Sequence, residues 1–130
     1  MNKMKIYVFG NSLVKEDSGA LQTMPTLQVQ FPQIQFVAVD PNENFPPENE
    51  KNITILDTVS GIYSVMFFDF TDLKNVEKTP ISPHDYDLLL HLLLLKKMGK
   101  IDSVKIIGLP MKIITHKEMK EIKRIISSLL

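Results

Sequence analysis

The sequence of 130 residues contains no cysteine. Disulfides and thiolate metal sites are therefore excluded, and any metal must be held by carboxylate, histidine or backbone oxygen. The same absence favours a reducing, cytoplasmic setting. A chain of this length buries roughly two-thirds of its unfolded surface without cross-links, so we predict a single domain over residues 1–130.

An excess of charge of either sign is also lacking, because 15 basic residues balance 15 acidic ones. No run of lysine and arginine with interleaved aromatics precedes the C-terminal segment, so nucleic acid is not an expected partner. The apolar stretch after the N-terminal lysines ends at Gly10 and is too short for a signal sequence or a membrane span. We expect a cytoplasmic monomer or weak oligomer with no membrane insertion.

Glycine-rich phosphate-binding motifs are missing too. The stretch GNSLVKEDSG (10–19) contains neither G-x-G-x-x-G nor the lysine pattern of a P-loop, which argues against a nucleotide-binding module. A phosphoacceptor receiver domain would carry an acidic pair at the end of its first strand and a lysine at the end of its fifth. This sequence has GNS and GLP there, which disfavours that class as well.

Apolar and β-branched runs predict five strands and three helices. The strands are expected at 4–9, 33–40, 52–58, 61–70 and 103–110, and the helices within 16–31, 82–98 and 115–130. Pro25 and Pro32 limit the first helix, so that Pro25 falls in an irregular or kinked turn. The proline-rich stretch 41–52 has no apolar period and predicts a long loop.

This order predicts an α/β fold, a three-layer α/β/α sandwich around a twisted, mostly parallel five-stranded sheet of phosphorylase/hydrolase-like type. The connection before Gly61 is too short for a parallel crossover, so the fourth strand is expected to pair antiparallel at an edge. Ligands of such sheets bind outside the carboxyl ends of the strands. That rule selects the turn at 10–19, the end of the third strand at Asp57, and any helix N-terminus at the same edge.

The second helix has four matching boundary signals. Ser82 is the expected N-cap, Pro83 the first helical residue, Asp85 the capping-box acid and Gly99 the C-cap. His84 then lies in the first turn, where the helix dipole disfavours protonation and leaves the imidazole able to bind a metal.

The other two histidines are read as structural. His91 lies seven residues after His84 among leucines, which favours a hydrogen-bonded core residue. His116 is expected at the surface or as a cap at the start of the last helix, where Thr115 and Glu118 repeat the capping pattern.

Acidic residues fall at both selected strand ends. Asp57 ends an apolar run, where a carboxylate is unfavourable unless it meets a cation or several donors; the alternative is a loop carboxylate that caps the turn TVSG. Glu16 and Asp17 follow the first strand, and the alternative for them is simple complementation of the helix dipole. Asp17, Asp57 and His84 can converge at one sheet edge, and such a ligand set suits a divalent ion such as nickel or zinc.

Three segments carry a resemblance to a known family. GNSLVKEDSG resembles the opening motif G-N-x-L-x-x-D-(D/E)-G-x-G of the hydrogenase maturation endopeptidases, and ITILDTV resembles their third-strand aspartate segment. ISPHDYDLLLHLLLLKKMGKIDSVKIIGLP resembles their S-x-H helix and the following strand with its V-G-x-x-P ending. The matches run in order over most of the chain.

The resemblance implies a five-stranded α/β/α fold and a nickel-dependent, aspartyl-type endopeptidase. Its substrate is the large-subunit precursor of a NiFe hydrogenase, whose C-terminal extension is removed in a single cut. The resemblance assigns the two carboxylates and the histidine that engage nickel, and act in catalysis, to Asp17, Asp57 and His84, with Glu16 in support. The nickel is that of the precursor, and zinc or cadmium is expected to occupy the site in vitro.

The sequence departs from the family pattern at three places. Ser18 and Ala20 replace glycines around Gly19. The loop 41–52 stands in place of the family's second helix. DPNEN stands where the family has aspartate-glycine-glycine, with Asp40 kept. These changes bear on cleavage geometry and substrate identity. The alternative hypothesis is therefore a degenerate member that binds metal or precursor without proteolysis.

Overall fold

The structure is a computed structural model that describes residues 3–10, 17–39, 44–72 and 86–130. Within these ranges, five strands and three helices follow one another: β1 (Met4–Val8), α1 (Gly19–Gln30), β2 (Ile34–Ala38), β3 (Asn52–Thr58), β4 (Met66–Asp69), α2 (Asp87–Lys97), β5 (Ser103–Leu109) and α3 (His116–Ser128). None of the described helices is both long and apolar enough to cross a membrane.

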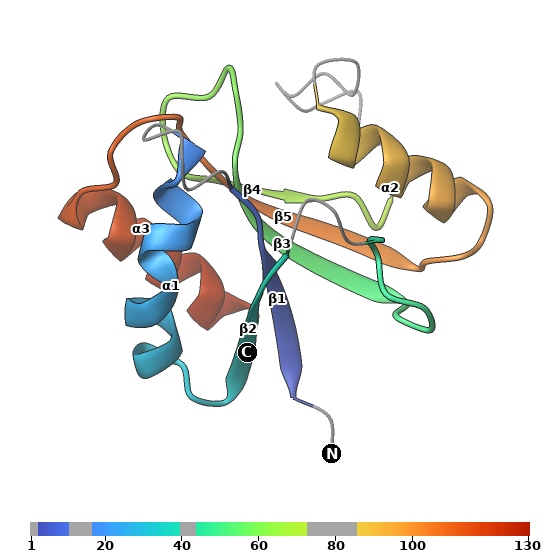
Figure 1. Cartoon of the computed structure of the whole chain (residues 1–130), viewed down its shortest axis with the longest axis horizontal. Coiled ribbons are helices and arrows are strands. Elements are labelled where there is room, and N and C mark those ends of the chain that lie inside the picture. The colour runs from blue at the N-terminus through green and yellow to red at the C-terminus, as the bar shows by residue number, and fades with distance from the viewer. Residues whose placement is uncertain (1–2, 11–16, 40–43, 73–85) are drawn as a thin grey trace.

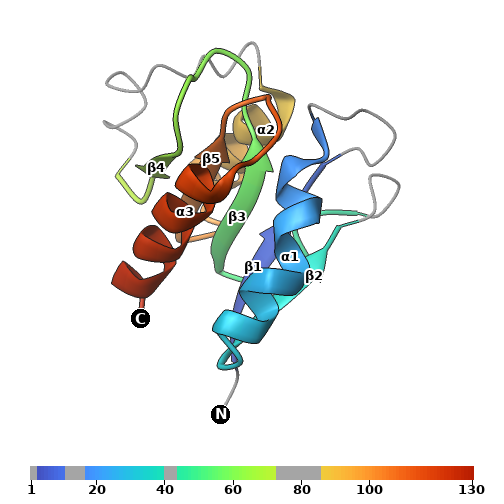
Figure 2. The same cartoon turned by 90° about the vertical axis from the view of Figure 1, so that its left-hand side faces the viewer.

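The strands form one sheet in the order β2-β1-β3-β5-β4. All neighbours are parallel except β4, which pairs antiparallel with β5 at the edge. Helices α1 and α3 lie side by side on one face, and α2 lies on the other (Figures 1 and 2). The predicted three-layer α/β/α fold with an antiparallel edge strand is confirmed.

Two apolar cores fill the spaces between these layers. The first core is formed by α1, α3 and the sheet side chains below them, among which Ile6, Leu56 and Ile107 are fully buried. The second is formed by α2 and the opposite face of the sheet. The central strands are buried on both faces, which explains why their sequences read as continuous apolar runs.

The loop 44–51 contains no helix or strand, as predicted for its described part. Phe45 supplies its packing: its ring meets Tyr7 and Phe9 edge-to-face, with centroid distances of 5.0 Å in each case. A single aromatic side chain thus covers the part of the second sheet face that α2 does not reach.

Helix α2 begins at Asp87 rather than at Ser82. The residue before it, Tyr86, has an extended backbone (φ −138°, ψ 89°), so the predicted helix start is wrong. The other end agrees with the sequence, because Gly99 has φ +78° and closes a Schellman motif. Its N–H donates to Lys96 O at 3.0 Å, and the N–H of Lys100 donates to Leu95 O at 2.9 Å.

Two further elements differ from prediction in their details. The fourth strand covers only Met66–Asp69, because Gly61 has φ +91° and the residues before Met66 form turns. Ile62 in this turn packs over Gly108, where an added Cβ would lie 3.2 Å from its Cδ1 atom. Pro25 lies inside α1, which continues to Gln30.

The outer edge of β2 is covered by a side chain of α1. The Nε2 atom of Gln28 donates to Ile34 O at 2.7 Å, and its Oε1 atom accepts from the N–H of Phe36 at 3.1 Å. The side-chain amide thereby satisfies backbone groups that a further strand would otherwise pair with.

We expect Gln28→Ala to lower the free energy of unfolding by about 1–2 kcal/mol, because both edge groups lose a partner. Urea denaturation measures the loss. Gln30→Ala, an exposed glutamine of the same helix, is the control and should stay within about 0.5 kcal/mol of the parent. Equal effects of the two substitutions would contradict the edge-capping role.

Candidate functional site

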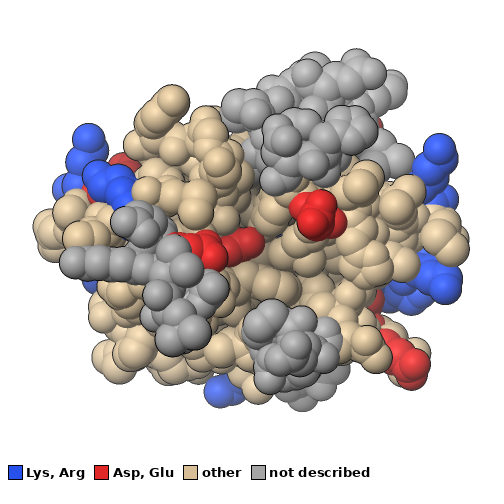
Figure 3. All heavy atoms as spheres, turned by 45° about the horizontal axis from the view of Figure 1, so that its top comes forward, with Lys and Arg blue, Asp and Glu red and all other residues tan. Residues whose placement is uncertain are grey.

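Two of the predicted site residues meet at the carboxyl edge of the sheet. Asp57 is the penultimate residue of β3, and Asp17 lies just before α1, on the return from β1. The parallel strands β1, β3 and β5 all run toward the top of Figure 1. In Figure 3, where this end comes forward, acidic atoms lie near the middle of the face and basic atoms at its rim.

Thr58 lies between the two carboxylates. Its hydroxyl donates to Oδ1 of Asp17, and its backbone N–H bonds to the carboxylate of Asp57. Thr58 itself is buried and is paired in register with Leu109 of β5. The last residue of β3 therefore fixes one carboxylate through its side chain and the other through its main chain.

Asp57 is only 8% exposed, and the hydroxyl of Tyr86 donates to its Oδ2 atom at 2.7 Å. Burial, together with the negative charge of Asp17, raises the pKa of Asp57 to about 7, against the hydrogen bonds from Tyr86 and the Thr58 N–H. Burial also raises the pKa of Tyr86, with the charge of Asp57 as the next cause. The phenol thus remains a hydrogen-bond donor.

Two glycines allow the chain to approach this site closely. A Cβ at Gly10 would lie 2.8 Å from the carbonyl oxygen of Asp17, which is shorter than real contacts of that kind. A Cβ at Gly19 would lie 2.8 Å from Cγ1 of Ile114 and 3.6 Å from Cγ2 of Thr58. Gly19, between Ser18 and Ala20, therefore preserves the close packing of the start of α1 against Ile114 in the loop after β5.

The remaining members of the predicted site, Glu16 and His84, lie outside the described residues, as does Asp40. The prediction that the helix dipole keeps His84 neutral required His84 to lie in the first turn of this helix. That prediction is not supported, because α2 begins at Asp87. The assignment of His84 as a ligand stays a prediction that rests on the sequence.

Of the other two predicted histidine positions, one is wrong and one is confirmed. His91 is exposed, so its predicted core position is wrong; its Nε2 lies 3.0 Å from the carbonyl oxygen of Phe45. Helix α2 buries Leu89 and Leu92 instead, and His91 faces an open pocket of about 480 Å³ beside the loop 44–50. His116 is the exposed first residue of α3, as predicted.

Sequence reasoning missed Thr58 and Tyr86. Tyr86 comes 29 residues after Asp57 and Thr58 comes 41 residues after Asp17, so neither contact leaves a local pattern. A weaker signal was present in the sequence: Thr58 follows Asp57 directly, Tyr86 comes two residues after His84, and both carry a hydroxyl.

The donor chemistry of the described pair fits a hard or borderline divalent cation. Two carboxylates held close together, one of them buried, repel each other when both are ionised, and a bound cation removes that repulsion. No group of three or more metal-ligating side chains occurs within residues 3–10, 17–39, 44–72 and 86–130. A third carboxylate or imidazole ligand would therefore have to come from the other residues, among which is His84.

Comparison with known proteins gives a result for the fold alone. No family model and no curated protein sequence matches the chain. Solved structures with the same fold include an uncharacterized protein from Wolinella succinogenes (16% identity, TM-score 0.58, covering 99% of this chain and 100% of that one). An endopeptidase from Escherichia coli is similar at 17% identity, with a TM-score of 0.57, covering 98% of this chain and 90% of that one.

The hydrogenase 2 maturation peptidase from Thaumarchaeota archaeon SCGC_AB-539-E09 also shares the fold. It is 15% identical, with a TM-score of 0.53, and the match covers 98% of this chain and 95% of that one. The chain therefore has a hydrogenase maturation peptidase-like fold, which agrees with the resemblance found in its motifs.

The raised pKa of Asp57 predicts a pH dependence of stability. The unfolded carboxyl has the ordinary aspartate pKa of 3.8, whereas the folded one stays protonated until about pH 7. Stability should therefore fall as the pH rises from about 4 to about 7 and level off above that, because the unfolded state loses its proton first.

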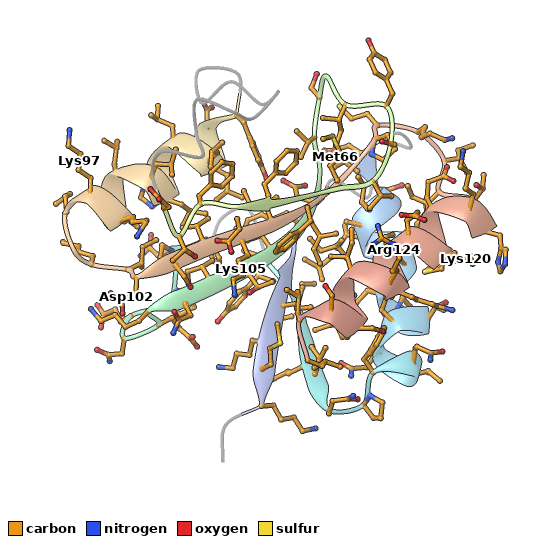
Figure 4. All side chains as sticks on the ribbon, turned by 180° about the vertical axis from the view of Figure 1, so that it is seen from behind. Met66, Lys97, Asp102, Lys105, Lys120 and Arg124 are labelled. Atoms are coloured by element: carbon orange, nitrogen blue, oxygen red, sulfur yellow. The ribbon has the colours of Figure 1, made fainter. Side chains whose placement is uncertain are left out.

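Asp57→Asn should remove this slope and raise the free energy of unfolding at pH 7.5, by an amount on the order of a few kcal/mol. Asp102→Asn is the control, because Asp102 is exposed at the opposite end of the sheet (Figure 4). Thermal unfolding of the three proteins between pH 4 and pH 8 measures the difference. A parent slope that persists in Asp57→Asn would contradict the assignment.

Proposed function

We propose that the protein is an endopeptidase that removes the C-terminal extension of the large-subunit precursor of a NiFe hydrogenase. The observation that carries the proposal is the Asp17–Thr58–Asp57 arrangement at the carboxyl edge of the sheet. The shared fold with a hydrogenase 2 maturation peptidase supports it. The motif resemblance across the same segments supports it independently.

In this proposal nickel belongs to the substrate. Asp17, Asp57 and His84 engage the nickel of the loaded precursor, so that only a metal-containing precursor is cut. A divalent cation can polarise a carbonyl or activate a water molecule, and either suits peptide hydrolysis. Zinc or cadmium would take the same position in vitro, because both accept oxygen and imidazole ligands.

The surroundings of the acidic pair suit a protein substrate. The loops that follow β3 and β5 lie side by side above the sheet edge (Figures 1 and 2) and are joined by the hydrogen bond from Val59 N–H to Leu109 O at 2.8 Å. Three large apolar side chains on these loops are exposed: Tyr63, Met111 and Ile113. Exposed apolar groups beside a candidate site are typical of protein–protein contact.

The loop after β5 is held in place by a buried carboxylate. Lys112 pairs with Glu118 at 2.7 Å, and the hydroxyl of Thr115 donates to the same side chain at 2.6 Å. Mainly through the bond from Lys112, these contacts lower the pKa of Glu118 to about 2. The loop can therefore present Met111 and Ile113 outward in a fixed position.

The proposed activity is tested with purified nickel-loaded precursor and with the same precursor free of metal. We expect release of the C-terminal peptide, detected by mass spectrometry, from the loaded form only. Asp17→Asn and His84→Ala should reduce the rate at least about 100-fold, because each removes a proposed ligand. His116→Ala, at an exposed histidine, is the matched control and should cleave normally.

Unchanged cleavage by His84→Ala would remove that residue from the site. Nickel-dependent association of precursor and protein without peptide release would instead favour the non-proteolytic binding module. If the protein neither associates with the precursor nor releases the peptide, the proposal is refuted.

For the apolar loops we expect Met111→Ser and Ile113→Ser to raise KM several-fold and to leave kcat nearly unchanged, because they remove precursor contacts and no chemical group. Steady-state kinetics with varied precursor concentration measures both constants. Val29→Ser, at an exposed apolar side chain of α1, is the control. A fall in kcat at constant KM would contradict a docking role.

A further inference from the structure

Both carboxylates of the pair accept a hydrogen bond from a neighbouring hydroxyl. Thr58 donates to Oδ1 of Asp17, and Tyr86 donates to Oδ2 of Asp57 at 2.7 Å. The two donors come from different elements, since Thr58 ends β3 and Tyr86 immediately precedes α2. Each carboxylate is thus held through one named oxygen by a side chain that carries no charge at neutral pH.

The backbone fixes both donors. Thr58 is 6% exposed, and its strand is hydrogen-bonded to β5 over its whole length. Its methyl group faces Gly19, where an added Cβ would lie 3.6 Å from it. The carbonyl of Tyr86 accepts the N–H of Leu90 at 3.1 Å, which anchors the residue to the first turn of α2.

We propose that Thr58 and Tyr86 are positioning residues that prearrange Asp17 and Asp57 for a divalent cation in the free protein. The inference rests on the proposed function, because it takes the aspartates as cation ligands. A hydroxyl on one oxygen of each carboxylate limits the rotation of that group and leaves acceptor lone pairs for ligation. Groups that orient a ligand in this manner typically contribute about 10–100-fold to metal affinity.

The inference is tested by calorimetric titration of the purified protein with nickel chloride and with cadmium chloride. Thr58→Val and Tyr86→Phe remove only the hydroxyls, and each should weaken binding about 10–100-fold. Thr58→Ser keeps the donor and should bind within a few-fold of the parent. Thermal unfolding of each variant checks that it is folded. If Thr58→Val does not fold, Tyr86→Phe tests the inference by itself.

The matched control is Thr71→Val. Thr71 donates to Oδ1 of Asp69 at 2.6 Å, so this substitution breaks a hydroxyl–carboxylate bond of the same kind away from the site. Its cation affinity should equal that of the parent. Unchanged affinity in both Thr58→Val and Tyr86→Phe would overturn the inference.

Two further outcomes separate this inference from the proposed function. A parent protein that binds neither cation would overturn the prearrangement, whereas peptide release from the nickel-loaded precursor would still establish the protease. Cation binding that depends on both hydroxyls, without peptide release, would support the positioning roles and count against the protease. Where cleavage occurs, Tyr86→Phe should need a higher concentration of nickel-loaded precursor than the parent does.

Discussion

The repulsion between two carboxylates at the end of a buried strand is the constraint on which the site depends. Asp57 cannot move away from Asp17, because β3 is paired with β1 and β5 and its end is packed beneath α1. The sheet therefore holds an unfavourable charge arrangement in place. Such an arrangement is tolerable in a fold when it serves to bind a cation, since the cation converts the repulsion into two favourable interactions.

The rest of the molecule supplies the rigidity that this arrangement needs. Helices α1 and α3 cover one face of the sheet, and the loop 44–51 packs with α2 on the other face through Phe45. The loop contributes a ring on Tyr7 and Phe9, and it also meets α2 through the contact of its backbone with His91. Both faces of the central strands are thereby buried among the described residues.

The sequence allowed the sheet to be predicted but not the details of α2. Strands buried on both faces leave continuous apolar runs, and the short connection at Gly61 was enough to predict an antiparallel edge strand. The start of α2 was misplaced because Ser82 and Pro83 form a capping pattern, whereas the contact of Tyr86 with Asp57 is tertiary. His91 was misplaced for a related reason: only one side of a leucine-rich helix is buried here.

The proximity of Asp17 and Asp57 could be predicted because parallel strands end at one edge of the sheet. Their hydrogen bonds could not be predicted, because they join residues distant in sequence. Those bonds also bear on the proposed function. A lysine or arginine beside Asp57 would neutralise it and take the position that a metal needs. Among the described residues, the groups that act on the pKa of Asp57 are Tyr86, Asp17 and the Thr58 N–H, and none of them is a cation. Uncharged donors add no positive charge beside Asp57, so the cation of the proposed function would meet no competing cation there.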